Sequence, residues 1–256
     1  MANTKVQNIA TEVTIVTDSD YGYLVSSMPT TPVDSKILGK NLFSGWIGAA
    51  AWAYASASTF TISGDQTAVY TKGVRVRWTQ TTVKYGVVAS SAYSAPNTTV
   101  TIVVNTSYTV ANAAITARAY SFLDNPLDWP DWFDYVPVWG SAGGTGVTIG
   151  NAVVLARYSL SKKTCTYKIS ATFGSTTTYG AGASWWTLSL PVTNASNVSG
   201  MGHYNDFSGS FFSGMIFHGG SGAQNALGCL SSFIAATVPI TWAVNDIIRI
   251  NGVYEW

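Results

Sequence analysis

Charge is what this sequence has least of. Asp, Glu, Lys and Arg make up 10% of its 256 residues, and the formal net charge is +1. An ordinary soluble domain carries about 25% charged residues. Because nucleic acids and acidic membranes are bound through large positive fields, this balance argues against a nucleic-acid partner.

Long apolar runs are also missing. Hydrophobic residues make up 47% of the chain, yet they are interrupted by Ser, Thr, Gly and Pro throughout. A membrane-spanning helix needs roughly 18 or more consecutive apolar residues, so we expect no membrane span. The opening MANTKVQNIATEV has no basic region followed by an apolar run, so we expect no secretory signal.

Cysteine and histidine are scarce, with two residues of each. Cys165 and Cys229 are too few for a disulfide framework, and the spacing does not decide whether they are bonded. His203 and His218 form no HxxxH pair, and no CxxC, GxSxG or phosphate-loop motif occurs. We therefore predict a protein without metal, cofactor or catalytic residues.

Strand periodicity dominates what is present. The stretch TCTYKISATF (164–173) alternates between polar residues and a face made of Cys165, Tyr167, Ile169, Ala171 and Phe173. Alternation with a period of two over ten residues predicts a half-buried strand. Helical windows are few, and only DSKILGKNLFSG (34–45) is expected to form a turn or two of helix. The sequence thus predicts an all-β fold.

The chain divides into four segments. Residues 1–44 form an N-terminal arm, with one hairpin expected from EVTIV and YGYLVS. Residues 45–122 predict a small β-module, and residues 136–256 predict a larger β-sandwich. Between them, residues 123–135 are rich in Pro, Trp and Asp. Proline cannot donate a ladder hydrogen bond, which favours a joint over a strand.

The joint region, FLDNPLDWPDWFDYVPVWG (122–140), allows two interpretations. Asp128, Asp131 and Asp134 recur every three residues beside aromatic rings, and paired carboxylates beside aromatic rings are typical of sugar-cleaving sites. The simpler interpretation is turn chemistry for the Asp residues and packing between modules for the aromatic residues. We favour the second interpretation, with the packing residues Trp129, Trp132, Phe133 and Trp139.

Two places are candidates for ligand binding. In SWWTLSLPV (184–192), Trp186 shares a face with Leu188 and Leu190, which leaves Trp185 pointing outward. An outward Trp on a strand anchors a subunit interface or stacks on a sugar. In MGHYNDF (201–207), His203, Tyr204 and Asp206 could donate to and accept from sugar hydroxyls.

Two long stretches resemble modules of virion proteins from tailed bacteriophages. The first runs from TFTISGDQT to NTTVTIVV (59–104), and the second from VTIGNAVV to WWTLSLPV (147–192). Such proteins are tail fibres, tail tips or minor structural proteins. The resemblance implies assembly in the host cytoplasm, a virion location and trimeric, jelly-roll-like tips. It also implies that DYGYLVSSMPTTPVDSKILGKNLF, in the arm, joins other virion proteins.

Three functions follow as expectations. The first is a homotrimeric fibre or tip protein whose jelly-roll-like sandwich recognises a host-surface glycan. The alternative is a purely structural decoration or head-fibre protein without receptor binding. The third is a glycan depolymerase that uses the Asp residues of the joint.

Overall fold

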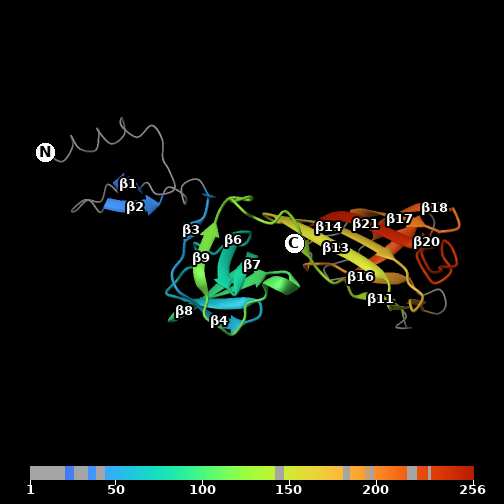
Figure 1. Ribbon diagram of the computed structural model, residues 1–256, viewed down its shortest axis with the longest axis horizontal. Helices are drawn as coiled ribbons and strands as arrows, with labels where there is room; N and C mark the ends of the chain where they lie inside the picture. The colour runs from blue at the N-terminus through green and yellow to red at the C-terminus, as the bar shows by residue number, and fades with distance from the viewer. Residues whose placement is uncertain are drawn as a thin grey trace, which may run out of the picture.

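The computed structural model describes residues 21–25, 34–38, 44–141, 147–180, 185–193, 195, 199–217, 224–229 and 232–256. These residues build antiparallel sheets, joined by turns and a single-turn 3-10 helix, Thr106–Tyr108 (Figure 1). The predicted all-β fold is confirmed. No helix within the described residues is long and apolar enough to cross a membrane.

A small hairpin precedes the two larger bodies. Strand β1 (Tyr21–Val25) pairs with β2 (Asp34–Leu38), with Tyr21 opposite Leu38. The predicted helical turn is therefore wrong for Asp34–Leu38. An isolated helix of a few residues is marginal in water, whereas the extended segment gains a ladder with β1. The expected partner strand, EVTIV, and most of the arm lie outside the described residues.

The first module is one curled, seven-stranded sheet with the order β3-β9-β6-β7-β8-β5-β4. Its core holds large aromatic and β-branched side chains, among them Trp52, Phe60 and Trp78. The register of β7 shifts between Val88 and Ser90, and a shift of this kind bends a strand. The strands are β3 (Ile47–Gly48), β4 (Trp52–Ser56), β5 (Thr59–Ser63), β6 (Arg75–Gln80), β7 (Thr82–Ser94), β8 (Asn97–Val103) and β9 (Thr116–Ser121).

The second module is sandwich-like and is built on the path β10-β13-β14-β21-β17-β18-β19-β16-β11. In Figure 1 the long strands β13, β14, β21 and β17 form one layer, and β16 and β11 form the other. Its strands are β10 (Phe133–Asp134), β11 (Trp139–Ser141), β13 (Val153–Ser161), β14 (Thr164–Thr172), β16 (Trp186–Ser189), β17 (Ser199–Asn205), β18 (Phe211–Phe217), β19 (Gln224–Cys229), β20 (Ser232–Phe233) and β21 (Ile247–Glu255). A separate ladder pairs β12 (Val147–Thr148) with β15 (Thr178–Tyr179).

The register predicted for TCTYKISATF places the right side chains in this core. Cys165, Ile169 and Phe173 are buried, and Phe173 meets Trp186 of the opposite layer with 6.0 Å between ring centroids. Cys165 is a free thiol, and its burial raises its pKa to about 12. The side chains of Cys229 and His218 lie outside the described part of the chain.

The two modules are packed together through aromatic rings. The Trp129 ring lies 5.7 Å from Tyr85 of the first module and 5.4 Å from Phe133 of the second. Strand β7 serves both bodies, because Val87 joins the core of the second module and Val88 that of the first. Trp129 and Phe133 therefore lie between the modules.

A buried cation, Arg75, links the first module, the joint and the second module. Arg75, on β6, donates through Nε to the Asp124 carbonyl at 3.0 Å and through Nη2 to the Leu160 carbonyl at 2.6 Å. Its Nη2 also lies 3.3 Å from Asp124 Oδ1, and Ser161 Oγ donates to the other Asp124 oxygen at 3.1 Å. First module, joint and second module are thus held by one hydrogen-bonded group.

The backbones of the modules also approach closely at Gly73. This residue has a φ of +94°, and a Cβ there would lie 3.3 Å from Cα and O of Lys162, in the β13–β14 turn. Any other residue would meet both the strained φ and the tight contact. Next to it, Lys72 Nζ donates to the Trp256 carbonyl and lies 4.5 Å from the centre of the Trp256 ring. The two modules therefore pack closely against each other at this point.

Candidate recognition face

The outward side chains of the second module's long strands form rows across one layer. Register places Arg157 opposite Lys168, Lys168 opposite Asn251, and Asn251 opposite Met201. The next row runs from Leu155 through Ser170 and Arg249 to His203. We call this surface the open face, and we define it by Leu155, Arg157, Lys168, Met201, His203, Arg249, Asn251 and Val253.

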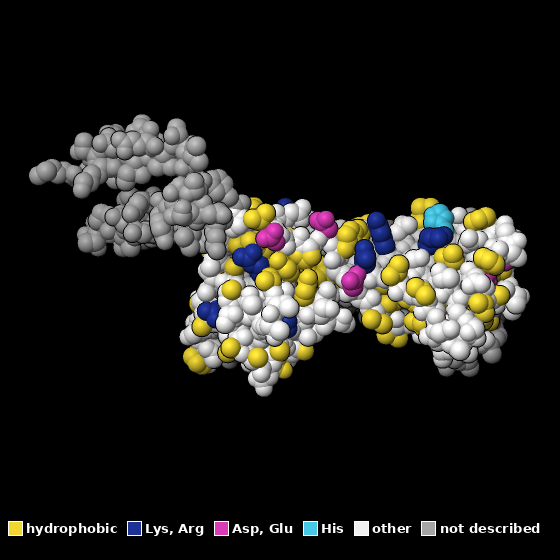
Figure 2. Space-filling view, viewed as in Figure 1, with side chains coloured by type: hydrophobic (Ala, Val, Ile, Leu, Met, Phe, Trp, Pro, Cys, Tyr) yellow, Lys and Arg dark blue, Asp and Glu magenta, His cyan; other side chains and the backbone are white. Residues whose placement is uncertain are grey.

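The open face is hollowed over β13, β14 and β21. The hollow has a volume of about 550 Å³, and its lining includes Leu155, Lys168, Arg249 and Asn251. Small-molecule sites in proteins have volumes of roughly 300–1,000 Å³, so this groove is large enough for a ligand. Figure 2 shows Lys and Arg side chains and the histidine interspersed with hydrophobic ones along this side of the module.

Positive charge prevails on the open face. Arg157 Nε lies 3.1 Å from Asp134 Oδ1, in an exposed pair. Lys168 Nζ lies 4.7 Å from the centre of the Trp132 ring. Within the described residues, neither Lys168 nor Arg249 has a carboxylate oxygen within 4.0 Å. Like charges directly opposite on neighbouring strands are destabilising, and Asp134 offsets this repulsion on the Arg157 side of the Arg157–Lys168 pairing.

Apolar side chains surround these cations. Leu155 is 62% exposed, Met201 54% and Val253 49%. Single exposed apolar residues are ordinary, but several on one sheet face make a patch that a ligand or partner can cover. The face therefore offers apolar contact, positive charge and, through Asn251, an amide that can both donate and accept.

The residues predicted to bind a ligand do not form one site. Trp185 is 43% exposed and lies beside Phe233, with 5.1 Å between ring centroids, next to β16 in the opposite layer. His203 belongs to the open face, where its Nδ1 lies 3.3 Å from Ser213 Oγ. Trp185 and His203 therefore face solvent from opposite layers of the sandwich.

Two further predictions need correction. Tyr204 has no exposed surface and packs against Trp242 in the core, because alternation along β17 turns it inward when His203 faces out. It is not available to a surface ligand. Asp206 accepts a hydrogen bond from Ser208 N at 2.8 Å and belongs to a tight turn, and its hydrogen bonds to Ser208 lower its pKa. Its role there is turn chemistry.

Two of the aromatic residues predicted to pack between the modules also lie elsewhere. Trp132 is half-buried over the open face, because it precedes Phe133, whose ring points into the core from the edge strand β10. Trp139 lies in the second module's core, 5.3 Å from Trp186 and 5.6 Å from Phe173 between ring centroids. The aromatic residues of this stretch therefore lie in three places: between the modules, in the core of the second module and over the open face.

The Asp residues of the joint do not line the groove. Asp128 and Asp131 are exposed, and Asp134 is held beside Arg157 at the edge. The groove lining contains no carboxylate. Within the described ranges, no three His, Cys, Asp or Glu side chains are grouped so that they could hold a metal ion.

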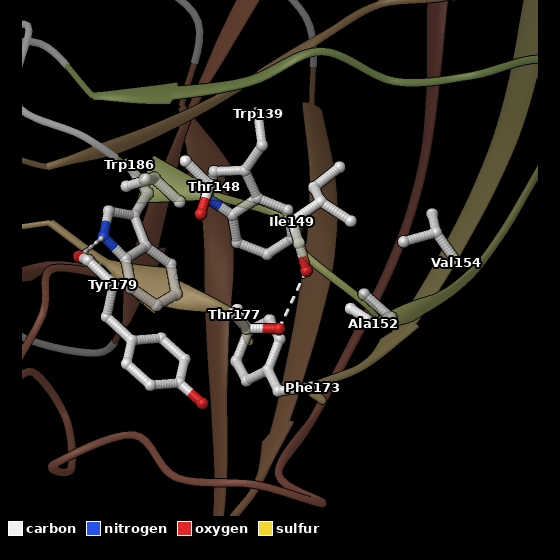
Figure 3. Close-up of a pocket in the computed structure, with 11 residues that line it drawn as sticks. Trp139, Thr148, Ile149, Ala152, Val154, Phe173, Thr177, Tyr179 and Trp186 are labelled. Atoms are coloured by element: carbon white, nitrogen blue, oxygen red, sulfur yellow. Dashed lines mark hydrogen bonds between the residues drawn. The ribbon is translucent and has the colours of Figure 1, made fainter. Parts of the chain in front are cut away.

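A second hollow lies inside the module, and residues of β12 and β15 contribute to its lining (Figure 3). Trp139, Phe173, Tyr179 and Trp186 surround it, and the volume open to a water-sized molecule is about 0 Å³. Thr177 Oγ1 donates to the Ile149 carbonyl at 2.8 Å, and both residues line the hollow. It is a well-packed part of the core and offers no room for a ligand.

Lys168, Arg249 and Asn251 were not predicted as site residues. The alternation in TCTYKISATF and DIIRINGVYEW already places them on the polar faces of their strands. What the sequence does not contain is the register that brings residues about 80 positions apart to neighbouring places.

Comparisons with protein-family models, curated proteins and solved structures gave no match for this chain. The open face and the chemistry of its side chains are therefore the features that point to a function.

Proposed function

We propose that this chain is a non-enzymatic structural protein of a tailed-bacteriophage particle, assembled in the host cytoplasm as part of a fibre or tip. Its second module presents the open face to a glycan on the host surface. The observation that carries recognition is the groove of about 550 Å³, which combines unpaired cations, an amide and apolar side chains. The virion assignment rests on the resemblance of residues 59–104 and 147–192 to phage modules.

Binding without cleavage is the form of recognition that the groove supports. Glycoside hydrolysis usually requires two carboxyl groups placed on either side of the scissile bond. The lining holds Arg157, Lys168 and Arg249 but no Asp or Glu. We expect no release of reducing sugar from any polysaccharide that the protein binds.

The close packing of the two modules at the joint supports a role in presenting the open face to a ligand. Arg75 and its partners hold the modules in one arrangement, and Trp129 fills the space between them. A body that is already ordered loses less conformational entropy when it binds. The first module would then act as a stalk that holds the open face in a fixed orientation.

Assembly is the other part of the proposal. We propose that the chain forms a homotrimer and that residues 1–44 attach it to other virion proteins. Exposed apolar side chains around the joint support self-association, because closed symmetry would cover them. They are Phe122, Leu123, Leu127, Val136 and Val138, which are 56–74% exposed. Light scattering should give the mass of three chains, and a stable monomer would contradict the trimer.

A glycan array tests the recognition proposal. The wild-type protein should bind a defined set of sugars, and the double variant Lys168→Gln/Arg249→Gln should weaken that binding. Trp185→Ala is the matched test of the opposite layer and should leave binding unchanged. Loss with Trp185→Ala alone would move the site to the opposite layer.

The decoration or head-fibre alternative predicts a different result. The same exposed apolar side chains could be covered by neighbouring subunits in the particle. The protein would then bind no sugar on the array, and immunogold labelling would place it on the capsid. Absence of label from every part of the particle would overturn both versions.

A further inference from the structure

On the basis of the proposed function, we infer that the open face selects acidic glycans, and that Lys168 and Arg249 together bind a sugar carboxylate. The class of ligand follows from how the charges of the open face are already compensated within the chain.

The cations of the groove are not equivalent. Arg157 has a carboxylate partner, Asp134, at 3.1 Å. Lys168 and Arg249 are exposed and, within the described residues, have no carboxylate within 4.0 Å. Removing charge from water is favourable only when a partner replaces the lost hydration, so these two side chains favour an anionic ligand over a neutral one.

Register places the two unpaired cations within reach of one anion. Arg249 lies opposite Ser170, and Lys168 lies two residues from Ser170 on the same strand. Lys168 and Arg249 are thus diagonal neighbours on adjacent strands, a relation that separates Cα atoms by roughly 7–8 Å. Side chains of this length can converge on a single carboxylate, which Arg can bind with two parallel hydrogen bonds.

The surroundings of the pair fit a sugar. Asn251 lies directly opposite Lys168 and can bind hydroxyl groups as donor and acceptor. Leu155 and Val253 line the groove and offer apolar contact for the C–H face of a sugar ring. Trp132 lies against Lys168 and extends this apolar surface at one end. Charge, amide and apolar contact therefore occur together within the groove.

Other occupants fit the face less well. A twofold contact whose axis passes through the pair would place Lys168 and Arg249 against the same cations of the second copy, which is repulsive. A nucleic acid would need many phosphate contacts, whereas the groove lining provides three cations and the chain has a net charge of only +1. A carboxylate-bearing glycan satisfies the pair and uses the remainder of the surface.

Matched acid and ester ligands test the inference. Calorimetric titration would use oligomers of galacturonic acid, hyaluronan and polysialic acid, each beside its methyl ester, which keeps the sugar but removes the charge. We expect at least one acid to bind at least tenfold more tightly than its ester. We also expect this preference to weaken in 0.5 M salt, because exposed charges are screened.

Variants test whether Lys168 and Arg249 are responsible for the preference for the acid over the ester. The double variant Lys168→Gln/Arg249→Gln should abolish the difference between acid and ester, with an unchanged melting temperature as the check on folding. Lys163→Gln is the matched control, because it removes an exposed cation in the β13–β14 turn outside the groove. It should leave the preference intact.

The outcomes separate the inference from the proposed function. Equal binding of acid and ester, binding of neutral array glycans alone, or an acid preference that survives the double variant would overturn the inference and leave glycan recognition standing. A failure of all three acids to exceed their esters would do the same. Absence of any glycan binding would overturn glycan recognition itself and favour the decoration or head-fibre alternative. Tighter binding of a single-stranded DNA oligomer than of every acid would assign the pair to phosphate.

Discussion

The strands β13, β14 and β21 present two faces of opposite chemistry. The inner face buries Tyr158, Tyr167 and Tyr254 with Cys165 and Ile169. The outer face carries Lys168 and Arg249 among Thr, Ser and exposed apolar side chains. Each strand contributes to both faces at every second residue. The comparison shows that one set of strands can be held rigid from one side and left free to recognise a ligand from the other.

The largest expected difference is between neighbouring residues at the end of β14. Phe173 is buried among Trp139, Trp186 and Trp242, whereas Thr172 points outward. Phe173→Ala should lower the free energy of unfolding by about 3–5 kcal/mol, since it removes a buried ring and leaves a cavity. Thr172→Ala should cost well under about 1 kcal/mol. Equal effects in urea denaturation would mean that the two faces have been exchanged.

A second pair compares the joint with the open face. Trp129 contacts rings of both modules, and Trp132 lies over Lys168 at the surface. Trp129→Ala should lower the free energy of unfolding by about 3 kcal/mol, as expected for a large ring between two packed bodies. Trp132→Ala should cost less than about 1 kcal/mol.

The two Trp variants should also differ in binding. Trp132→Ala should weaken the binding of any acidic glycan, because it removes apolar contact beside Lys168, whereas Trp129→Ala should not. The reverse order in either measurement would place Trp132 at the joint, where the sequence alone had placed it.

Substitution of Gly252 tests how closely the side chains of the inner face are packed. A Cβ added there would lie 2.5 Å from Cε1 of Tyr167, which leaves no room for a methyl group. Gly252→Ala should therefore lower the free energy of unfolding by about 1–3 kcal/mol. Asn251→Ala, the outward neighbour, is the control and should change stability by less than about 0.5 kcal/mol. A neutral Gly252→Ala would show that Tyr167 does not lie along this strand.

Alkaline pH should affect the inner face before the outer one. Burial raises the pKa of the Cys165 thiol to about 12 and also raises the pKa values of the Tyr158, Tyr167 and Tyr254 hydroxyls. In the unfolded chain these groups titrate near about 8.5 for Cys and about 10 for Tyr. The unfolded state therefore loses protons first, and the stabilisation present below about pH 8.5 is lost as the pH rises through the folded pKa.

The measurement is the free energy of unfolding at pH 8, 9, 10 and 11, which should fall steadily. Tyr135→Phe is an informative control. Burial raises the pKa of Tyr135 as well, and its hydroxyl has no hydrogen-bond partner among the described residues. This variant should match the wild type at pH 8 and lose less stability at pH 11. Constant stability across the range would contradict the burial of these hydroxyls.

The sequence predicted part of the local structure, and it did not predict how the site is assembled. Alternation in TCTYKISATF identified which side of β14 is buried, because a half-buried strand must alternate. The prediction of helical turns from capping residues was wrong for DSKIL, which forms strand β2. Capping residues signal a helix end only if a helix forms, and pairing with β1 decides otherwise.

The positions of the site residues were harder to predict from the sequence than the buried side of β14. The proximity of His203, Tyr204 and Asp206 in sequence suggested a cluster, but strand alternation sends Tyr204 into the core. Lys168 and Arg249 are far apart in the chain and become neighbours only through the β14–β21 ladder. Register between distant strands is set by tertiary packing, which no local pattern encodes.

Methionine signals test directly whether the open face of the second module is the recognition surface that we propose. The chain has four methionines; Met201 lies on the open face and Met215 beside it on β18, while Met1 and Met28 belong to the arm. In a protein labelled with ¹³C at the methionine methyl groups, titration with the tightest-binding acidic oligosaccharide should shift the Met201 signal most and the Met215 signal less. The Met1 and Met28 signals should stay in place. Saturating binding with an unmoved Met201 signal would contradict the account.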